Sequence, residues 1–310
     1  MQNIALKAAK MGISGACSLI ELFVTSTPLL QTILFNQTDQ EAKKLQNAQS
    51  NTPQIVTDLI TNIADDRKIN DLKIILHNNY HHYAMHDRAK ILYVPTYLAE
   101  ELESLLQNSN RSIEEEQKFN LHIGTIHHEL THCINKSGVY SPLYDTAIET
   151  TGAIAISAIL TSVIKKHIPI IHNNFALRNG FKLIRSGFTL YTTLNIMNMN
   201  MYKKYDELKA DDGIPNKKEL LTAQIAKYEA KHNDYLTSID IIKERADYPT
   251  ILWKELPDNQ FTRKQLLAMK LLPKSLFNKP LTMDIVFHAK QSHPSDLRRE
   301  LRFKERFAKL

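Results

Sequence analysis

Two histidines and a glutamate in the stretch Leu121 to Asn135 have the types and spacing of a metal-dependent hydrolase site. His128, Glu129 and His132 form the pattern H-E-x-x-H. Side chains four positions apart on a helix share a face, so both imidazoles could bind one cation. Glu129 follows the first ligand, and its carboxylate could reach a water on that cation. The pattern therefore predicts a zinc site with Glu129 as general base, the alternative being a helix with two unliganded histidines.

A third ligand must come from elsewhere in the chain, because a catalytic zinc usually has three protein ligands and one open position. A histidine six positions after His132 would complete a metzincin site, but Gly138 stands there and excludes that class. Glu149 and Glu207 remain as candidates. We favour Glu207, because Asp211 lies four residues later on the same helix face. Asp211 could then accept a hydrogen bond from the far nitrogen of a ligating histidine.

The elements that must position these residues are mainly helices, with a short sheet before the H-E-x-x-H helix. Four apolar residues recur at helical spacing, which would bury one side of that helix: Ile123, Ile126, Leu130 and Ile134. Short apolar runs predict strands at 72–76 and 91–94. Other helices are expected at residues 97–107, 145–166, 174–209 and 217–245, and in a basic segment that ends at Leu310. The fold class is therefore α+β, predominantly helical.

A histidine-rich segment, residues 77–88, lies between the two predicted strands. It contains His77, His81, His82 and His86, which raises the question of a second metal cluster. Their spacing is irregular, so we favour a strand or hairpin that is rich in histidine.

The composition is that of a globular protein rather than a disordered one. Among 310 residues, 43% are hydrophobic and 23% are charged. The formal net charge of +6 is spread along the chain and does not form a nucleic-acid footprint. Cys17 and Cys133 are the two cysteines, so there is no disulfide framework, and Cys133 is expected to be a small packing residue.

Two apolar segments bear on membrane association. Residues 1–35 partly resemble a secretory signal, but Glu21 lies within the apolar run and no small-x-small cleavage site follows. The segment Thr150–Ile164 is uncharged but shorter than the ~20 residues of a spanning helix. For the N-terminal stretch we favour a packing helix, with a signal or membrane anchor as the alternative. For 150–164, a buried helix or a membrane-dipping segment fits better than a full span.

Three segments, taken in order, resemble the M48 family of zinc metallopeptidases, which includes the CAAX prenyl peptidase and HtpX-type membrane peptidases. They are HHELTH at 127–132, ELKAD at 207–211 and HPSDLRR at 293–299. The resemblance covers about 70–299. It divides the chain into an N-terminal helical region, 1–70, and a metallopeptidase domain, 71–310.

This resemblance implies a zincin-like catalytic core with a small sheet beside the H-E-x-x-H helix. Glu207 and Asp211 match the family's E-x-x-A-D helix, and His293 and Arg299 match its C-terminal H-P-x-x-x-x-R motif. His293 and Arg299 are thereby candidates to bind the substrate carbonyl or to support the site. The chain departs from the family at Gly213, which with the next two residues ends the glutamate helix early, and in its missing or shortened transmembrane helices.

The expected function is that of a zinc-dependent endopeptidase with one zinc per chain, held by His128, His132 and Glu207. Glu129 would be the general base for attack by the zinc-bound water. The substrate would be a peptide or protein bound extended along a strand edge in the region 78–94, and the protein would be intracellular or membrane-associated. The alternative is a non-catalytic helical interaction protein, associated with a membrane, whose metal site is structural or degenerate. A third interpretation is a latent peptidase.

Overall fold

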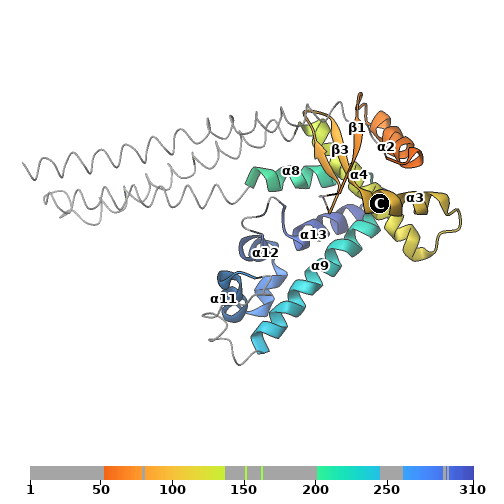
Figure 1. Ribbon diagram of the computed structural model, residues 1–310. Helices are drawn as coiled ribbons and strands as arrows, with labels where there is room; N and C mark the ends of the chain where they lie inside the picture. The colour runs from red at the N-terminus through yellow and green to blue at the C-terminus, as the bar shows by residue number, and fades with distance from the viewer. Residues whose placement is uncertain are drawn as a thin grey trace, which may run out of the picture. The chain divides into compact units, whose positions relative to one another are not determined.

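The computed structural model describes residues 52–78, 81–136, 151, 162, 201–244, 261–288, 291 and 293–310. The chain divides into two compact units, formed by residues 1–40 with 139–202 and by residues 41–138 with 203–310. Nearly all described residues belong to the second unit, which is mostly helical with one small sheet (Figure 1). The α+β, predominantly helical class is confirmed for this unit.

Other sequence predictions lie outside the described residues. They concern the apolar N-terminal stretch, the apolar segment 150–164, the alternative ligand Glu149 and the position of Gly138. Among the described helices, none combines the length and the apolar character needed to cross a membrane.

The described elements follow one another as α2 (Gln54–Asp66), β1 (Lys73–His77), β2 (Ala84–His86), β3 (Ile91–Pro95), α3 (Thr96–Gln107), α4 (Ile113–Asn135), α8 (Met201–Asp212), α9 (Lys218–Glu244), α11 (Arg263–Leu271), the 3₁₀ helix η1 (Lys274–Asn278), α12 (Pro280–Val286) and α13 (Asp296–Phe307). The strands predicted at 72–76 and 91–94 and the helices predicted at 97–107 and 217–245 are all present, with ends shifted by one residue.

The sheet has the strand order β1-β3-β2. β3 is central, parallel to β1 and antiparallel to β2, and all five of its residues are buried. Met85 of β2 is opposite Leu92 of β3. The histidine-rich segment therefore supplies a short strand at one edge of the sheet, as the strand-or-hairpin interpretation predicts.

The helix that carries the H-E-x-x-H motif, α4, has strong local signals at both ends. The Ser112 side chain accepts a hydrogen bond from the Glu115 backbone N–H, and the Glu115 side chain accepts one from the Ser112 N–H. This capping box satisfies two backbone donors that a helix start leaves free. Three glutamates in the first turn are favoured by the helix dipole. At the other end Lys136 adopts the left-handed conformation, with φ 51°, and terminates the helix.

One hydrophobic core joins α2, α3, α4 and the sheet. Ile60 of α2, Leu92 of β3 and Leu130 of α4 are fully buried in it, and Cys133 packs against it, as expected for a small packing residue. Because α2 contributes to this core, the predicted domain boundary at residue 70 does not coincide with a boundary in packing. The resemblance to a family domain starts after α2. Ile134, which is expected from its spacing on the buried side of the motif helix, is 48% exposed in the last turn of α4.

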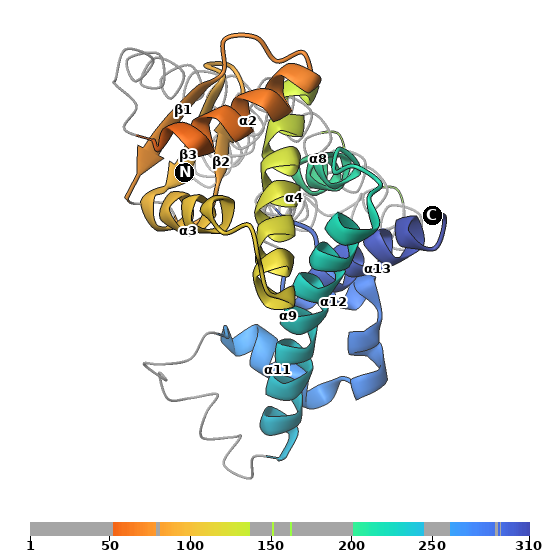
Figure 2. The same ribbon diagram turned by 90° about the vertical axis from the view of Figure 1, so that its right-hand side faces the viewer.

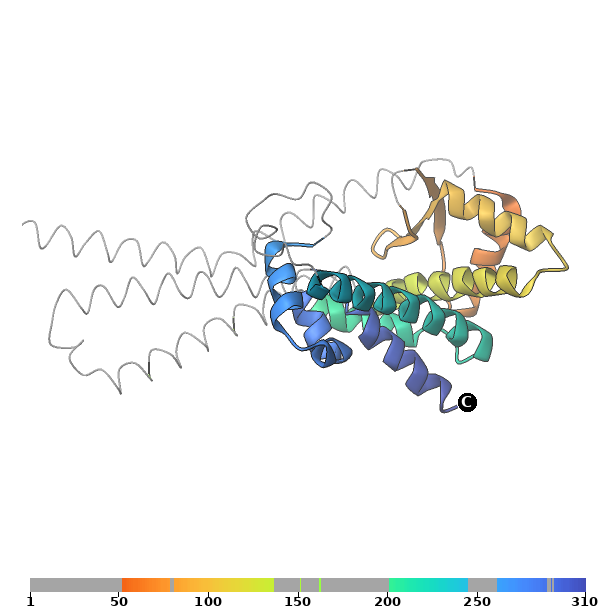
Figure 3. The ribbon, with the colours of Figure 1, turned by 90° about the horizontal axis from the view of Figure 1, so that it is seen from below.

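The C-terminal helices form two further hydrophobic clusters along α9. Tyr228 of α9 stacks on Phe303 of α13, with ring planes 5° apart. Figures 2 and 3 show α13 lying along one end of α9 and α11 packing near its other end. Met269 and Phe277 are fully buried in the cluster at that end. α9 also packs on α4, and so connects the two halves of the unit.

Candidate metal centre

Three side chains from two helices converge on one point. His128 and His132 lie one turn apart on α4, and Glu207 approaches them from α8. The Nε2 atoms of the histidines are 3.3 Å apart, and the Glu207 carboxylate oxygens lie 3.2 Å from His128 Nε2 and 3.4 Å from His132 Nε2. Ligand atoms about 2.1 Å from a tetrahedral zinc would be separated by roughly 3.4 Å. The donor types and their spacing therefore fit a metal ion, and this group could hold one.

A carboxylate lies behind each of the two histidines. His128 Nδ1 donates to Asp211 Oδ1 at 2.9 Å, and His132 Nδ1 donates to Asp206 Oδ2 at 3.2 Å. A neutral imidazole with its proton on Nδ1 presents the lone pair of Nε2. Both rings are thus held in the tautomer and orientation that leave Nε2 free to bind a cation.

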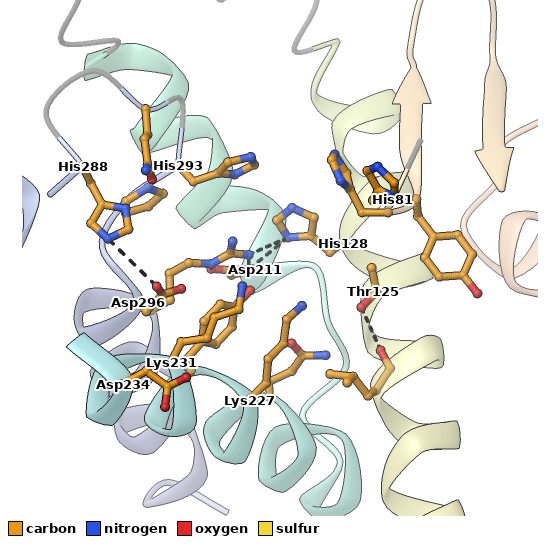
Figure 4. A pocket seen from close by; sticks show the side chains of 18 of the residues that line it. His81, Thr125, His128, Asp211, Lys227, Lys231, Asp234, His288, His293 and Asp296 are labelled. Carbon is orange, nitrogen blue, oxygen red and sulfur yellow. Dashed lines mark hydrogen bonds and ion pairs between the residues drawn. The ribbon is translucent and has the colours of Figure 1, made fainter. Parts of the chain in front are cut away.

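Arg299 completes the support of His128. Its guanidinium donates from Nε to Asp211 Oδ2 at 2.8 Å and from Nη2 to Asp211 Oδ1. Asp211 is completely buried and Arg299 nearly so. Figure 4 shows Asp211 beside the His128 ring. The resemblance allows Arg299 two roles, which are to bind the substrate carbonyl or to support the site. Its contacts with Asp211 are those of a residue that supports the site.

The carboxylates favour positive charge at this position. Burial alone would lower the pKa of His128, but hydrogen bonds with Asp211 and Glu207 raise it to about 9. Burial disfavours the charged form of Glu207, yet the hydrogen bonds with His128 and His293 hold its pKa well below its ordinary value. The pKa of Asp211 is also lowered, because Arg299 outweighs the effect of burial. The field that stabilises an imidazolium would equally stabilise a bound metal cation.

His293 lies at the mouth of the site. Its Nδ1 atom is 2.8 Å from Glu207 Oε2, and its side chain is 51% exposed. His293 and His128 both line the cleft described below. His293 is therefore close enough to hold Glu207 and is also accessible to a ligand in the cleft.

Glu129 is positioned by a backbone group of the sheet. The Met85 N–H donates to Glu129 Oε2 at 3.1 Å, so this amide of β2 points toward α4 rather than toward β3. Since β2 is the outer strand of the sheet, its free edge faces the candidate general base. Glu129 is partly buried and, like His128, lines the cleft.

The end of α8 approaches α4 unusually closely at Gly213. A Cβ atom at this position would overlap the Thr131 side chain, so only glycine fits. Arg67, just after α2, donates to His127 Nδ1 at 3.0 Å, to Thr131 Oγ1 at 2.7 Å and to the Gly213 carbonyl. These contacts fix the spacing between the helix that carries Glu207 and the helix that carries the two histidines.

A cleft of about 1000 Å³ extends from the metal centre between α4, α9 and the C-terminal segment. Its lining includes aromatic rings such as Tyr235 and Phe287 and several ionisable groups (Figure 4). His81 and His82 line it as well. Within the part of the chain that the structure describes, the histidines of segment 77–88 form no three-ligand group of their own.

Several contacts of this site cannot be found from the sequence. Asp206 lies beside Glu207 in the acidic cluster, but the sequence does not reveal that it binds His132. The contacts of Arg67 and of the Met85 amide carry no sequence signal, because they depend on how distant segments pack.

Comparisons with family models, with curated proteins and with solved structures find no match for this chain.

Proposed function

We propose that this protein is a zinc-dependent endopeptidase of the M48 type, with a zincin-like core and a peptidase domain that extends from residue 71 to residue 310. The observation that carries the proposal is the set of separations among His128, His132 and Glu207, which fits one tetrahedral ion. A carboxylate that directly follows the first ligand, Glu129, distinguishes a hydrolytic site from a purely structural one. Structural zinc sites, in addition, usually have four protein ligands.

In the proposed mechanism the protein's own groups move one proton. A bound zinc would lower the pKa of a water molecule and polarise the carbonyl of the scissile peptide bond. Glu129, oriented by the Met85 N–H, accepts a proton from the attacking water and returns it to the leaving amine. Asp211 and Asp206 keep the two rings in the required tautomer throughout.

The free edge of β2 is the proposed binding place for the substrate backbone. An extended peptide can add to such an edge by main-chain hydrogen bonds. Because Met85 lies in β2 and its amide already faces Glu129, a peptide on this edge would pass close to the general base. This geometry supports an endopeptidase that binds its substrate in an extended form.

The test combines metal content with peptide cleavage by the purified full-length chain. The wild type should contain about one zinc per chain and show chelator-sensitive cleavage of an unfolded protein substrate. Glu129→Gln should keep the zinc and lose activity by at least about 10²-fold. Glu207→Ala should lose most of the zinc, whereas the exposed Glu114→Gln, also on α4, should change neither property.

Two results would contradict the proposal. Cleavage by Glu129→Gln at the wild-type rate would remove the general base. A zinc content near zero in a folded wild-type protein would favour the alternative of a non-catalytic interaction protein with a degenerate site.

A further inference from the structure

The wall of the cleft opposite α4 is formed by α9, and its charge is predominantly positive. Lys227 and Lys231, one turn apart, both line the cleft. Figure 4 shows Lys227 reaching from α9 into the space that His128 and Asp211 border. Lys231 is exposed at the rim, close to the exposed Asp234, whereas Lys227 is partly buried. Lys227 is therefore the cation of this wall that a bound ligand would meet inside the cleft.

Lys227 has no counter-ion in the described part of the chain. No carboxylate of the described residues lies within ion-pair distance of its ammonium group. The Nζ atom lies 5.2 Å from the centroid of the Tyr228 ring. Burial, followed by the charges of Arg299 and Lys231, lowers the pKa of Lys227 to about 8. An ammonium group in such a position is destabilised unless an anion arrives.

The carboxylates that share the cleft are already engaged. Asp211 binds Arg299, Glu101 binds His122 at 3.2 Å, and Asp296 lies 3.9 Å from His288. None of them approaches Lys227 closely enough to form an ion pair. Asp211 and Asp296 attract the ammonium group only from beyond ion-pair distance, so a carboxylate brought by a ligand would be the first to contact it directly.

A second polar group of the same wall also lacks a partner. Gln224 precedes Lys227 by three residues and so lies on the same face of α9. It lines the cleft and is only 2% exposed, and its amide nitrogen has no hydrogen-bond partner among the described residues. This nitrogen lies against Gly124 of α4, where an added Cβ atom would be 2.4 Å away, so Gln224 is held inside the wall. Buried amides are normally hydrogen-bonded, so the wall that carries Lys227 contains a second polar group without a partner among the described residues.

We propose that Lys227, on the wall that Gln224 helps to form, is a subsite for a carboxylate group of the peptide substrate. The subsite rests on the proposed peptidase function and narrows its substrate class to peptides that present a negative charge near the scissile bond. The charge could belong to an Asp or Glu side chain or to a free C-terminus. Both sources offer the same carboxylate to the ammonium group, and the experiment separates them.

The test measures binding rather than turnover. Zinc-loaded full-length Glu129→Gln protein is titrated at low salt with four pools of fluorescein-labelled octapeptides. Two pools contain Asp or Glu at random internal positions and two contain Asn or Gln there instead. Each composition is made with a free and with an amidated C-terminus.

We expect the acidic pools, the free-ended pools or both to bind at least about tenfold more tightly than the uncharged pool, as for hydrogen bonds to charged groups. An affinity gap between the Asp/Glu pools and the Asn/Gln pools identifies a side-chain carboxylate. An affinity gap between the free and the amidated pools identifies the C-terminus. Adding Lys227→Met should close the gap, while Lys227→Arg should retain most of it. Lys218→Met is the matched control, since Lys218 is an exposed residue of α9 outside the cleft.

Equal binding of all four pools, or no binding at all, would overturn the subsite. A charge preference that survives Lys227→Met would also overturn it, because the metal itself would then be the carboxylate receptor. These outcomes are distinct from failure of the proposed function, in which the wild type would bind acidic pools selectively and still cleave no peptide.

Discussion

The two walls of the cleft treat buried charge in opposite ways. On the wall formed by α4 and α8, ionisable groups at the metal centre have partners of opposite charge or hydrogen-bond partners, as His128 with Asp211 and Asp211 with Arg299 show. On the wall formed by α9, Lys227 has no counter-ion and the Gln224 amide nitrogen has no acceptor among the residues that the structure describes. Both walls belong to the same compact unit and border the same space.

This difference indicates which kind of ligand each wall can bind. Paired groups hold their geometry before any ligand arrives, which suits ligands that must meet a metal ion at fixed distances. Unpaired groups gain a partner only when a ligand binds. They raise the free energy of the unliganded protein, and only a ligand of opposite charge relieves this, which makes binding selective. The predictions below test the contrast from its largest expected effect to its smallest.

Removing one partner of a buried charge pair on the wall formed by α4 and α8 should have the largest effect on stability. Asp211→Asn would leave the buried Arg299 without its counter-charge, which typically costs about 3–5 kcal/mol. The free energy of unfolding from denaturant titration would measure this. Asp212→Asn, the neighbouring residue in an exposed pair with Arg302, should cost less than about 1 kcal/mol. Equal losses in the two variants would show that the Asp211 network is not what stabilises this wall.

Asp206→Asn should act on the metal more than on the fold. It removes the carboxylate that orients His132, and loss of such a partner typically lowers metal affinity by about 10- to 100-fold. A zinc titration against a competing chelator would measure the change. An unchanged zinc affinity would mean that the His132 ring is oriented by other contacts.

On the opposite wall, removing a charge should stabilise the protein. We expect Lys227→Met to raise the free energy of unfolding by about 1–2 kcal/mol at pH 7, because an uncompensated ammonium group is lost. The folded-state pKa of about 8 lies below the ordinary value of 10.5, so the unfolded state binds more protons between these values. Wild-type stability should therefore rise with pH across this window, and the advantage of Lys227→Met should disappear above it.

Stability measured at several pH values for wild type and variant would check this prediction. A destabilising Lys227→Met, or an advantage that does not depend on pH, would show that the ammonium group already has a partner.

The smallest effect is expected from removing a buried hydrogen bond that lies outside the metal centre. Tyr83 Oη lies 2.9 Å from His122 Nδ1, and both residues are buried. Tyr83→Phe removes this hydrogen bond and should cost about 1 kcal/mol in thermal or denaturant unfolding, with zinc content unchanged. Loss of zinc in this variant would extend the paired network to His122.

The sequence is informative wherever a short-range signal decides the structure. The apolar spacing of the segment around Ile126 predicts α4, and a four-residue separation is enough to place His128 and His132 on one face. The same rule predicts that Glu207 and Asp211 share a face of α8. The short apolar runs around β1 and β3 predict the sheet, because strands of this length are recognised by composition alone.

Only the tertiary structure decides which of these faces meet and which charges remain unpaired. The contact of Asp206 with His132 and that of Arg67 with Gly213 join side chains separated by tens of residues. Whether Lys227 meets a counter-ion within the described ranges depends on such distant side chains as well. Local periodicity specifies the direction of a side chain within its own helix. Pairing across helices depends on packing distances, which no spacing within one segment contains.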